Sequence, residues 1–296
     1  MRTLPKITVV TPSYNQGAFL EGTIRSVLDQ GYPSLEYSII DGGSTDDSVS
    51  IIKRYENRLA YWESEKDRGQ GHAINKGFSR ATGDILGWLN SDDVLEPGAL
   101  HTVAEQAARF PGAGAFVGHG RIIDVAGEQI YYKEPAELTF EGFCRWMDGG
   151  DFMQPSCFFR RSTWEAAGPL DESIHIALDV DLWLRMVKKV DFRRIDELLS
   201  TSLSHENAKT TAFHNHMVLD CSVVIIKAGG ARFVRHHLND MASRLSYYEA
   251  NFNKIMNNPV VRFIKPVGRL LMKPAVRWQD VSWNRGPGSE GHCDKK

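Results

Sequence analysis

Apolar and polar positions in the first 110 residues follow two alternating periods. Short apolar runs rich in β-branched residues predict strands at residues 7–11, 35–40, 59–63 and 85–89. Between the runs, apolar residues recur every three or four positions, which predicts helices at residues 18–29, 46–55, 71–81 and 97–108. Strand–helix repeats of this kind indicate an α/β fold with a mainly parallel central sheet covered by helices on both faces.

The start of the second helix carries local signals of its own. Ser44 or Thr45 is expected to cap it, and Asp46 and Asp47 are expected in its first turn. Carboxylates in a first turn interact favourably with the helix dipole. The fourth helix is expected to begin at Pro97, a residue common at the first helical position.

After residue 112 the pattern becomes richer in strands. Further strands are predicted at residues 115–117, 121–125, 129–133 and 158–160, and only helices from about residue 212 onward. Residues 179–189 predict a helix with Leu182, Met186 and Val187 facing inward, so Trp183 is expected in the core rather than on a sugar.

Composition excludes several classes of protein. The 296 residues are 42% hydrophobic and 24% charged, which is typical of a soluble globular protein rather than a disordered or fibrous one. No apolar run is long enough to span a membrane, and the first ten residues do not read as a signal peptide. The four cysteines fit no metal-binding spacing, so we expect reduced thiols and a cytoplasmic location.

Charge divides the chain unevenly. Residues 227–296 carry a net charge of +8 and the remainder −10, which suggests two tasks. We expect a catalytic domain over residues 1–210, with halves at about 1–115 and 116–210. A helical, basic extension is expected over residues 211–296, ending in a disordered segment from 285.

Polar, turn-forming residues follow four of the predicted strands, at residues 11–15, 41–45, 64–71 and 90–93. Ligands of open parallel sheets bind beyond the carboxyl ends of the strands, so these loops are the candidate site. Common phosphate-binding loops are absent from the sequence, which argues against ATP at a P-loop or NAD at a dinucleotide fold.

Two of these loops could bind ligands directly. Asp92 and Asp93 follow an apolar strand, and adjacent carboxylates suit Mg²⁺ or Mn²⁺, but taken alone the loop is more typical of a cap for the next helix. Asp41 could accept hydrogen bonds from a base or a sugar, with the glycines after it allowing close approach, or it could serve an N-capping turn.

Five segments taken together resemble glycosyltransferase family 2, whose members are inverting enzymes with the GT-A fold. The segments are TPSYNQGAFLEGTIRSVLDQ, SIIDGGSTDDS, KDRGQGHAINKGFSRATGDILGWLNSDD, QPSCFFRRSTWEAAGPLDE and ALDVDLWLRM. The resemblance covers about residues 5–210. Each motif alone has little specificity, but their shared order makes chance agreement improbable.

The resemblance implies a role for each matching position. It places the nucleotide, usually uridine, and the rest of the donor against Thr11, Pro12, Ser13, Tyr14, Asp41, Asp67, Arg68, Asn75 and Asp92. It implies a Mn²⁺ or Mg²⁺ ion held by Asp93, Asp92 and His205, although a loop histidine is as often only solvated. It also implies that Gln154 borders the acceptor, although this segment could equally be a turn before a strand.

The general base implied by the resemblance is Asp179, with Asp181 as the alternative base or an acceptor contact. Asp179 could instead be only a helix cap. An inverting displacement needs one base on the face opposite the leaving group, and no covalent nucleophile. Asn90, Leu178 and His119 depart from the commonest family pattern, which leaves open which carboxylate binds the metal directly.

The resemblance therefore implies a metal-dependent hexosyltransferase that uses a nucleotide sugar, with UDP as the expected carrier, and a glycan or lipid-linked acceptor. Processive polymerisation is not expected, because Pro274 replaces the glutamine of the Gln-x-x-Arg-Trp motif. The alternatives are a catalytically silent nucleotide- or sugar-binding protein and a sugar nucleotidyltransferase, whose glycine-rich first loop is not present. No nucleic-acid partner is expected.

The basic extension suggests a further partner. Apolar and basic residues alternate in three- and four-residue steps over residues 259–273, which is typical of helices that lie on anionic membrane surfaces. Pro266 interrupts the pattern, and the lysine stems could instead cover the catalytic domain. We therefore expect a cytoplasmic protein, with peripheral binding at the inner face of the membrane as the alternative to internal packing.

Overall fold

The computed structural model describes residues 4–204 and 214–258. The chain divides into two compact units, one ending at Leu238 and the other beginning at Asn239. The domain boundary predicted near residue 210 lies outside the described residues and stays a prediction.

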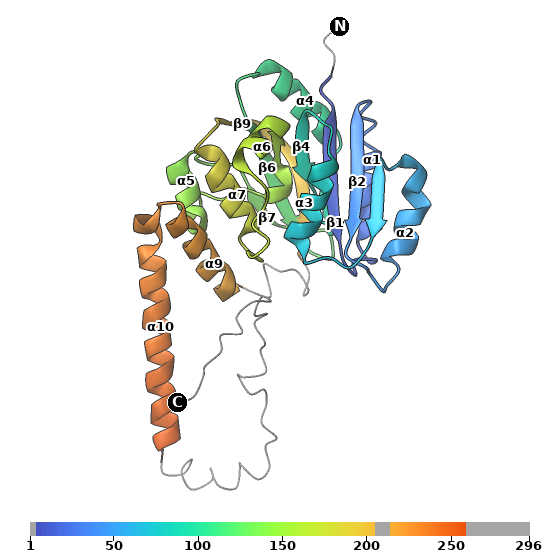
Figure 1. Cartoon of the computed structure of the whole chain (residues 1–296). Helices are drawn as coiled ribbons and strands as arrows, with labels where there is room; N and C mark the ends of the chain where they lie inside the picture. The colour runs from blue at the N-terminus through green and yellow to red at the C-terminus, as the bar shows by residue number, and fades with distance from the viewer. Residues whose placement is uncertain (1–3, 205–213, 259–296) are drawn as a thin grey trace, which may run out of the picture. The chain divides into compact units, whose positions relative to one another are not determined.

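The first half of the larger unit alternates strand and helix as predicted (Figure 1). Its elements are β1 (Ile7–Ser13), α1 (Leu20–Leu28), β2 (Leu35–Asp41), α2 (Ser48–Tyr55), η1 (Glu56–Arg58), β3 (Tyr61–Ser64), α3 (Gln70–Arg80) and β4 (Ile85–Trp88). β1 pairs in parallel with both β2 and β4, and β2 pairs in parallel with β3. The carboxyl ends of these four strands therefore lie at one edge of the sheet.

The second half contains more strands and shorter helices. Its elements are β5 (Asp93–Leu95), α4 (Ala99–Arg109), β6 (Ala115–Ile123), β7 (Gln129–Lys133), α5 (Phe140–Cys144), η2 (Trp146–Asp148), η3 (Gln154–Ser156), β8 (Cys157–Arg160), α6 (Arg161–Ala167), α7 (Leu178–Val187) and β9 (Phe192–Leu203). Two helices follow, α9 (His214–Lys227) and α10 (Ala231–Asn257), which agrees with the expectation of helices alone for the described part of this region.

The strands join in one sheet, in the order β3-β2-β1-β4-β8-β6-β9-β5, with β7 paired to β6. The antiparallel pairings all involve β5, β7 or β8, whereas the first four strands and the β6–β9 pair are parallel. The predicted α/β fold class is therefore confirmed, with a mixed sheet whose first half is entirely parallel.

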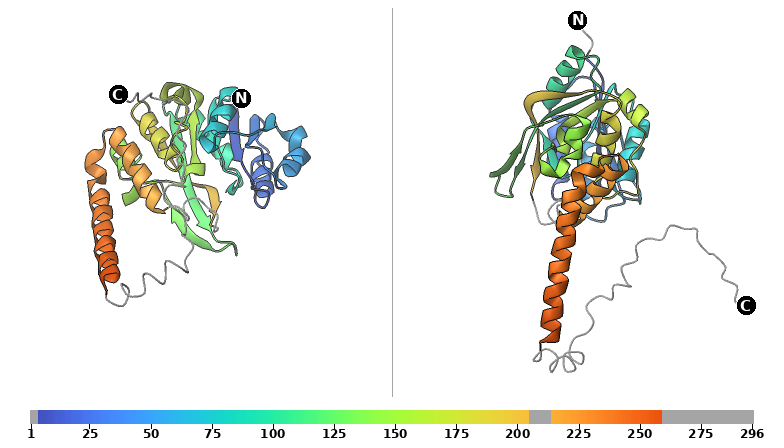
Figure 2. Two further views of the ribbon diagram at one scale, coloured as in Figure 1. Left: turned by 60° about the horizontal axis from the view of Figure 1, so that its bottom comes forward. Right: turned by 90° about the vertical axis from the view of Figure 1, so that its left-hand side faces the viewer.

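Helices cover both faces of the sheet (Figure 2). Alternate residues of β1 point to opposite faces, because side chains of a strand have a period of two. Val10 packs in a cluster with α3, α6, α7 and α9, while Ile7 and Val9 pack in a second cluster with α1, α2 and α4. Trp183 is fully buried in the first cluster, which confirms its expected place in the core.

Several local predictions need correction. Neither Ser44 nor Thr45 caps α2, whose N-cap residue is Asp47, and α4 begins at Ala99 rather than at Pro97. α2 begins at Ser48, so Asp46 and Asp47 precede it, and Asp46 instead accepts hydrogen bonds from the backbone N–H groups of Gly17 and Ser48. The strands predicted at 115–117 and 121–125 are one strand, β6. The small residues between them hid this continuity: a side chain at Gly118 would lie 2.3 Å from Leu199, so the neighbouring strand requires glycine there.

β5 and β9 were not predicted from the sequence. β9 begins with charged residues in adjacent pairs, Arg193 with Arg194 and Asp196 with Glu197, and its register is set by β6 on one side and β5 on the other. Pairing of this kind depends on tertiary context more than on the strand's own composition.

No helix in the described ranges is long and apolar enough to cross a membrane. The buried Cys144, Cys157 and Cys221 are free thiols, as expected. Cys293 and the segment 259–273 lie outside the described residues.

Candidate active site

Three polar side chains stand next to one another where β1, β2 and β3 end. The strand register places Ser13 opposite Asp41, and Asp41 opposite Ser64. The Oδ2 atom of Asp41 accepts hydrogen bonds from the Ser64 hydroxyl at 2.7 Å and from the Ser44 backbone N–H at 2.9 Å. Asp41 is 1% exposed, so its carboxylate holds the loop after β2 in one conformation.

The loops after β1 and β2 are joined to each other. The backbone N–H of Asn15 donates to Ser44 Oγ at 2.8 Å, and the N–H of Thr45 donates to Asn15 Oδ1 at 2.9 Å. Asn15 has a φ of 51°, in the left-handed region that asparagine tolerates better than most residues. The two loops therefore form one preformed wall at the sheet edge.

The predicted nucleotide residues of β1 differ in what they present. Thr11 is buried, with its hydroxyl 3.0 Å from the Tyr37 hydroxyl, and Pro12 is also buried. Ser13 Oγ is buried and makes no hydrogen bond within the described residues, while Tyr14 is 61% exposed. Within this set, the Ser13 hydroxyl is therefore available to hydrogen-bond a ligand, and the exposed Tyr14 ring is available to contact one.

The loop after β3 lies against the loop after β2. A side chain at Gly42 would lie 2.9 Å from Asp67 Oδ2, so glycine is what allows Asp67 this close approach. Asp67 Oδ1 also accepts a hydrogen bond from the Gly69 backbone N–H at 2.8 Å, immediately before α3.

Arg68 and Asn75 connect this loop to the segment before α7. Arg68 pairs with Glu172 at 2.7 Å, and Asn75 exchanges hydrogen bonds with the backbone of Leu170 at 2.9 and 3.0 Å. Glu172 was not predicted as a site residue, because its only signal in the sequence is its place at the end of the fourth family segment. Both predicted residues thus position the second half of the chain against the first.

The acidic pair follows β4. Asp93 is 6% exposed, and its Oδ2 accepts a hydrogen bond from the Asn90 side-chain amide at 3.0 Å. Burial and, after it, the neighbouring negative charge of Asp92 raise the pKa of Asp93 to about 7. Hydrogen bonds from Ser202 and Asn90 act in the opposite direction.

A hard divalent cation fits this position. The groups that stabilise the Asp93 carboxylate are a hydroxyl and an amide, both neutral, so they compensate the charge of Asp93 only in part. Asp92, Asp93 and nearby amide oxygens supply only oxygen donors, the type that Mg²⁺ and Mn²⁺ prefer. His205, the predicted third ligand, lies outside the described residues, and the described chain reaches Ser204, shortly after Ser202 pairs with Asp93.

Gln154 belongs to the same cluster. Its side-chain amide donates to the Trp88 carbonyl at 3.0 Å, and its Oε1 accepts from Asn90 at 3.2 Å. Gln70, at the start of α3, donates to Asn90 Oδ1 at 2.7 Å. Asn90, which departs from the commonest family pattern, therefore ties three segments together beside Asp93, a role that no linear pattern revealed.

Asp179 lies in the first turn of α7, near the start of β8, which pairs antiparallel with β4 and so begins at the same edge of the sheet. Burial raises the pKa of the Cys157 thiol well above its usual value, and the negative charge of Asp179 raises it further, which places Asp179 within electrostatic range of the start of β8. Trp183, one turn later on α7, stacks on Trp88 of β4 with ring centroids 5.2 Å apart.

Asp181 is engaged differently. Its carboxylate pairs with Arg185 at 2.9 Å, and the Arg185 guanidinium also donates to the carbonyls of Ala167, Gly168 and Pro169. Asp181 therefore helps to fix the turn after α6 to α7.

The family model for "Glycosyl transferase family 2" matches residues 8–166, more than half of the chain. The chain belongs to glycosyltransferase family 2. The match contains the β1, β2 and β4 loops described above, and the resemblance drawn from the five segments is confirmed.

Two bacterial relatives show how far the sequence similarity extends. Over 215 residues, 69% of this chain, it is 26% identical to an Escherichia coli chondroitin synthase, of whose length it spans only 30%. It is 30% identical over 190 residues, 62% of this chain and 73% of the relative, to a putative teichuronic acid biosynthesis glycosyltransferase, TuaG, of Bacillus subtilis.

Solved structures share the fold at low sequence identity. Staphylococcus aureus TarS (residues 1–349) superposes with a TM-score of 0.59 and 18% identity over 79% of this chain and 71% of that one. A mannosyltransferase from Pyrobaculum calidifontis, solved with GDP-Man and Mn²⁺, superposes with a TM-score of 0.54 and 17% identity over 91% of this chain and 86% of that one.

Proposed function

We propose that this chain is a metal-dependent, inverting and non-processive hexosyltransferase. It moves a sugar from a nucleotide-sugar donor, with UDP as the carrier, to a hydroxyl group of a glycan or a lipid-linked acceptor. The observation that carries the proposal is the buried Asp93 beside Asp92 at the end of β4, on the same sheet edge as the joined loops of Ser13 and Asp41.

The donor is assigned to the joined loops after β1, β2 and β3. Ser13 Oγ and the exposed Tyr14 offer a hydroxyl and an aromatic surface, while Asp41 and Asp67 hold the loops rigid. A preformed pocket lowers the entropy lost on binding. Support for UDP comes from TarS, which was solved with UDP-GlcNAc, although the Pyrobaculum relative was solved with GDP-Man.

Departure of a nucleoside diphosphate needs charge neutralisation at the leaving group. Asp92 and Asp93 would hold a Mn²⁺ or Mg²⁺ ion, with His205 as the proposed third ligand, and the ion would stabilise the developing diphosphate charge. Asn90 and Gln154 keep the Asp93 carboxylate in position through their hydrogen bonds. The Mn²⁺ in the Pyrobaculum mannosyltransferase supports the choice of metal.

Asp179 is proposed as the general base that removes the proton of the acceptor hydroxyl. A positioned base contributes typically ~10²–10⁴-fold to rate. Asp181 is the weaker candidate, because its carboxylate is already paired with Arg185 at 2.9 Å. We assign the acceptor to the side of the site formed by Gln154 and α7, which holds both Asp179 and the stacked Trp183.

Release of free nucleotide tests the proposal. Full-length protein is incubated with UDP-sugars and GDP-mannose, with and without Mn²⁺, and the free diphosphate is measured. We expect release of UDP that depends on Mn²⁺ and rises with a suitable acceptor. A sugar nucleotidyltransferase would instead form UDP-sugar from UTP and a sugar phosphate, and a silent binding protein would do neither.

A cytoplasmic location and peripheral contact with an anionic membrane through residues 259–273 remain part of this proposal, as does the division into a catalytic domain over residues 1–210 and a basic extension. The motivation is the +8 net charge of residues 227–296.

A further inference from the structure

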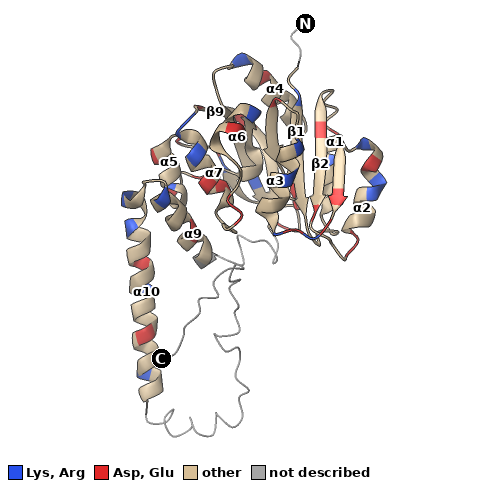
Figure 3. Cartoon of the chain, in the orientation of Figure 1, with Lys and Arg blue, Asp and Glu red and all other residues tan. Residues whose placement is uncertain are grey.

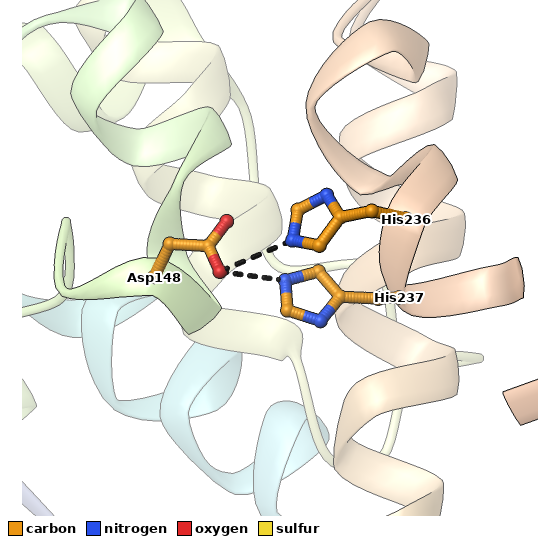
Figure 4. A group of neighbouring side chains, drawn as sticks. All are labelled: Asp148, His236 and His237. Carbon is orange, nitrogen blue, oxygen red and sulfur yellow. Dashed lines mark hydrogen bonds and ion pairs between the residues drawn. The ribbon is translucent and has the colours of Figure 1, made fainter. Parts of the chain in front are cut away.

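A cluster of possible metal ligands lies outside the sheet edge described above (Figure 4). Asp148 ends η2, and His236 and His237 lie in the first two turns of α10, almost 90 residues later in the chain. Asp148 Oδ1 is 3.3 Å from His236 Nε2 and 3.0 Å from His237 Nε2. The ligand atoms of the three side chains all lie within 4.8 Å of one another.

Hydrogen bonding alone leaves this cluster incompletely satisfied. His237 Nε2 is buried and makes no hydrogen bond within the described residues, although Asp148 Oδ1 is close enough to be a partner. The 3.0 Å separation is short enough for a hydrogen bond, so the angle between the imidazole nitrogen and the carboxylate oxygen is what prevents one. A buried polar atom without a partner costs free energy unless another ligand supplies one.

We propose that Asp148, His236 and His237 form a binding site for a divalent cation of the zinc class. Two imidazole nitrogens and one carboxylate oxygen match the donor set of zinc sites that keep a fourth position for water. Bonds of about 2.1 Å in a tetrahedron place neighbouring ligand atoms about 3.4 Å apart. The two nitrogen–oxygen distances of 3.0 and 3.3 Å are close to this spacing, so small side-chain rotations suffice.

This site differs in chemistry from the acidic pair after β4. Oxygen donors alone favour Mg²⁺ and Mn²⁺, whereas imidazole nitrogens favour Zn²⁺ and Cu²⁺ over those ions. Its role is to tie the start of α10 to η2, a connection that Arg145 and Phe233 also support through a cation–π contact at 5.2 Å. The fourth ligand position is left to water, and the proposed transferase reaction does not use the site.

Zn²⁺ titration of untagged, chelator-treated full-length protein tests this site, with Mg²⁺ in excess to occupy the oxygen-rich position. We expect one tight Zn²⁺ equivalent that His237→Gln and Asp148→Asn each weaken by at least ~10-fold, because each removes one ligand. Co²⁺ in place of Zn²⁺ should give tetrahedral absorption bands in the wild type. His175→Gln removes an exposed histidine outside the cluster and should leave Zn²⁺ affinity unchanged.

A tight Zn²⁺ equivalent that survives in both His237→Gln and Asp148→Asn would overturn the assignment, as would a wild type that binds none. Circular dichroism and thermal unfolding without metal establish that each variant is folded. Transfer activity with Mn²⁺ separates this site from the proposed active site, because the variants should keep it even where Zn²⁺ binding is lost.

An independent observation concerns the second half of α10. Apolar residues occur there at alternating three- and four-residue steps, namely Met241, Leu245, Tyr248, Phe252 and Ile255. The last four are each 59–67% exposed, although they lie on one stripe of the helix. Alternating steps of three and four are the heptad pattern of a coiled coil, with Leu245 and Phe252 at a positions and the others at d positions.

We infer that this stripe pairs with the same stripe of a second copy of the chain, as a parallel two-stranded coiled coil. Arg244 and Glu249 occupy the g and e positions that face each other between parallel chains. In an antiparallel pair the flanking positions would bring like charges together instead. Residues 239–257 carry two basic and two acidic side chains, seen along α10 in Figure 3, so anionic lipid would not attract this segment.

Light scattering after gel filtration measures the oligomeric state of the full chain. We expect a dimer, weakened at least ~100-fold by Tyr248→Asp, while Tyr247→Asp leaves it intact because Tyr247, 64% exposed, lies off the stripe. Arg244→Glu should weaken the dimer, and Arg244→Glu with Glu249→Arg should restore it. A wild type that is monomeric at micromolar concentration would refute the coiled coil, and so would equal effects of the two tyrosine variants. A chain that does not dimerise but floats with vesicles would refute it as well.

Discussion

Glu36 offers a test of how the sheet is stabilised at the end away from the proposed active site. It is the second residue of β2, opposite Thr8 of β1. Its carboxylate accepts hydrogen bonds from the Thr82 backbone N–H and hydroxyl, both at 2.7 Å, and from Lys6 Nζ at 2.9 Å, besides one from Thr8. Glu36→Gln keeps the shape of the side chain and removes the charge that these donors stabilise.

The magnitude follows from the pKa of this carboxyl group. Burial opposes ionisation, but the hydrogen bonds from Thr8, Thr82 and Lys6 outweigh it and lower the pKa from 4.5 to about 2. A shift of about 2.5 units corresponds to roughly 3.4 kcal/mol, since each unit is worth about 1.36 kcal/mol. The side chain is only 13% exposed, and glutamine retains one acceptor oxygen, so we expect a loss of about 2–3 kcal/mol.

The pH dependence has a definite sign. The folded-state pKa lies below the unfolded one, so the charge of Glu36 stabilises the fold fully above about pH 5 and progressively less as pH falls from 4.5 toward 2. Its contribution should fall to about 1.4 kcal/mol at pH 3. The wild type and Glu36→Gln should therefore converge in stability at low pH.

Urea unfolding at pH 7, 5 and 3 measures this difference. Glu65→Gln is the matched control, because its carboxylate is 73% exposed and 3.9 Å from Lys76, so we expect a change below about 0.5 kcal/mol. Transfer activity at 25 °C should be unchanged in Glu36→Gln, since the proposed site lies at the other ends of the strands. If wild type and Glu36→Gln differ in unfolding free energy by the same amount at all three pH values, then packing rather than the charge of Glu36 stabilises this end of the sheet.

The remaining predictions concern the proposed site and the basic extension. Asp93→Ala should abolish Mn²⁺-dependent transfer at every Mn²⁺ concentration, and full wild-type activity in EDTA would contradict a metal role. Asp179→Asn should lower transfer at least ~10²-fold with little change in UDP binding. If Asp179→Asn transfers normally and Asp181→Asn does not, the general base is Asp181 instead. Full-length protein should float with anionic vesicles, less so at high salt, and deleting residues 259–296 should abolish flotation while leaving UDP binding intact. If the full-length protein does not bind such vesicles, the basic stripe is better explained by packing on the rest of the chain.

Patterns in the sequence were enough to predict the first half of the fold and the location of the proposed site. The strands and helices up to β4 follow simple apolar periods, which local geometry imposes on any buried face. The polar loops that contain Asp41, Asp67 and Asp93 follow these strands directly, and parallel pairing brings the strand ends to one edge. Linear order was therefore enough to predict that these residues lie near one another.

The way in which those residues are held depends on contacts between distant segments. Asn90, Gln70 and Gln154 meet beside Asp93 although they come from segments up to 84 residues apart, and no linear pattern encodes a hydrogen bond between them. The elements missed, β5 and β9, owe their conformation to pairing with each other and with β6 rather than to their own composition. The choice between Asp179 and Asp181 likewise rests on a side-chain contact, the pairing of Asp181 with Arg185, because two carboxylates two positions apart on a helix point to different sides.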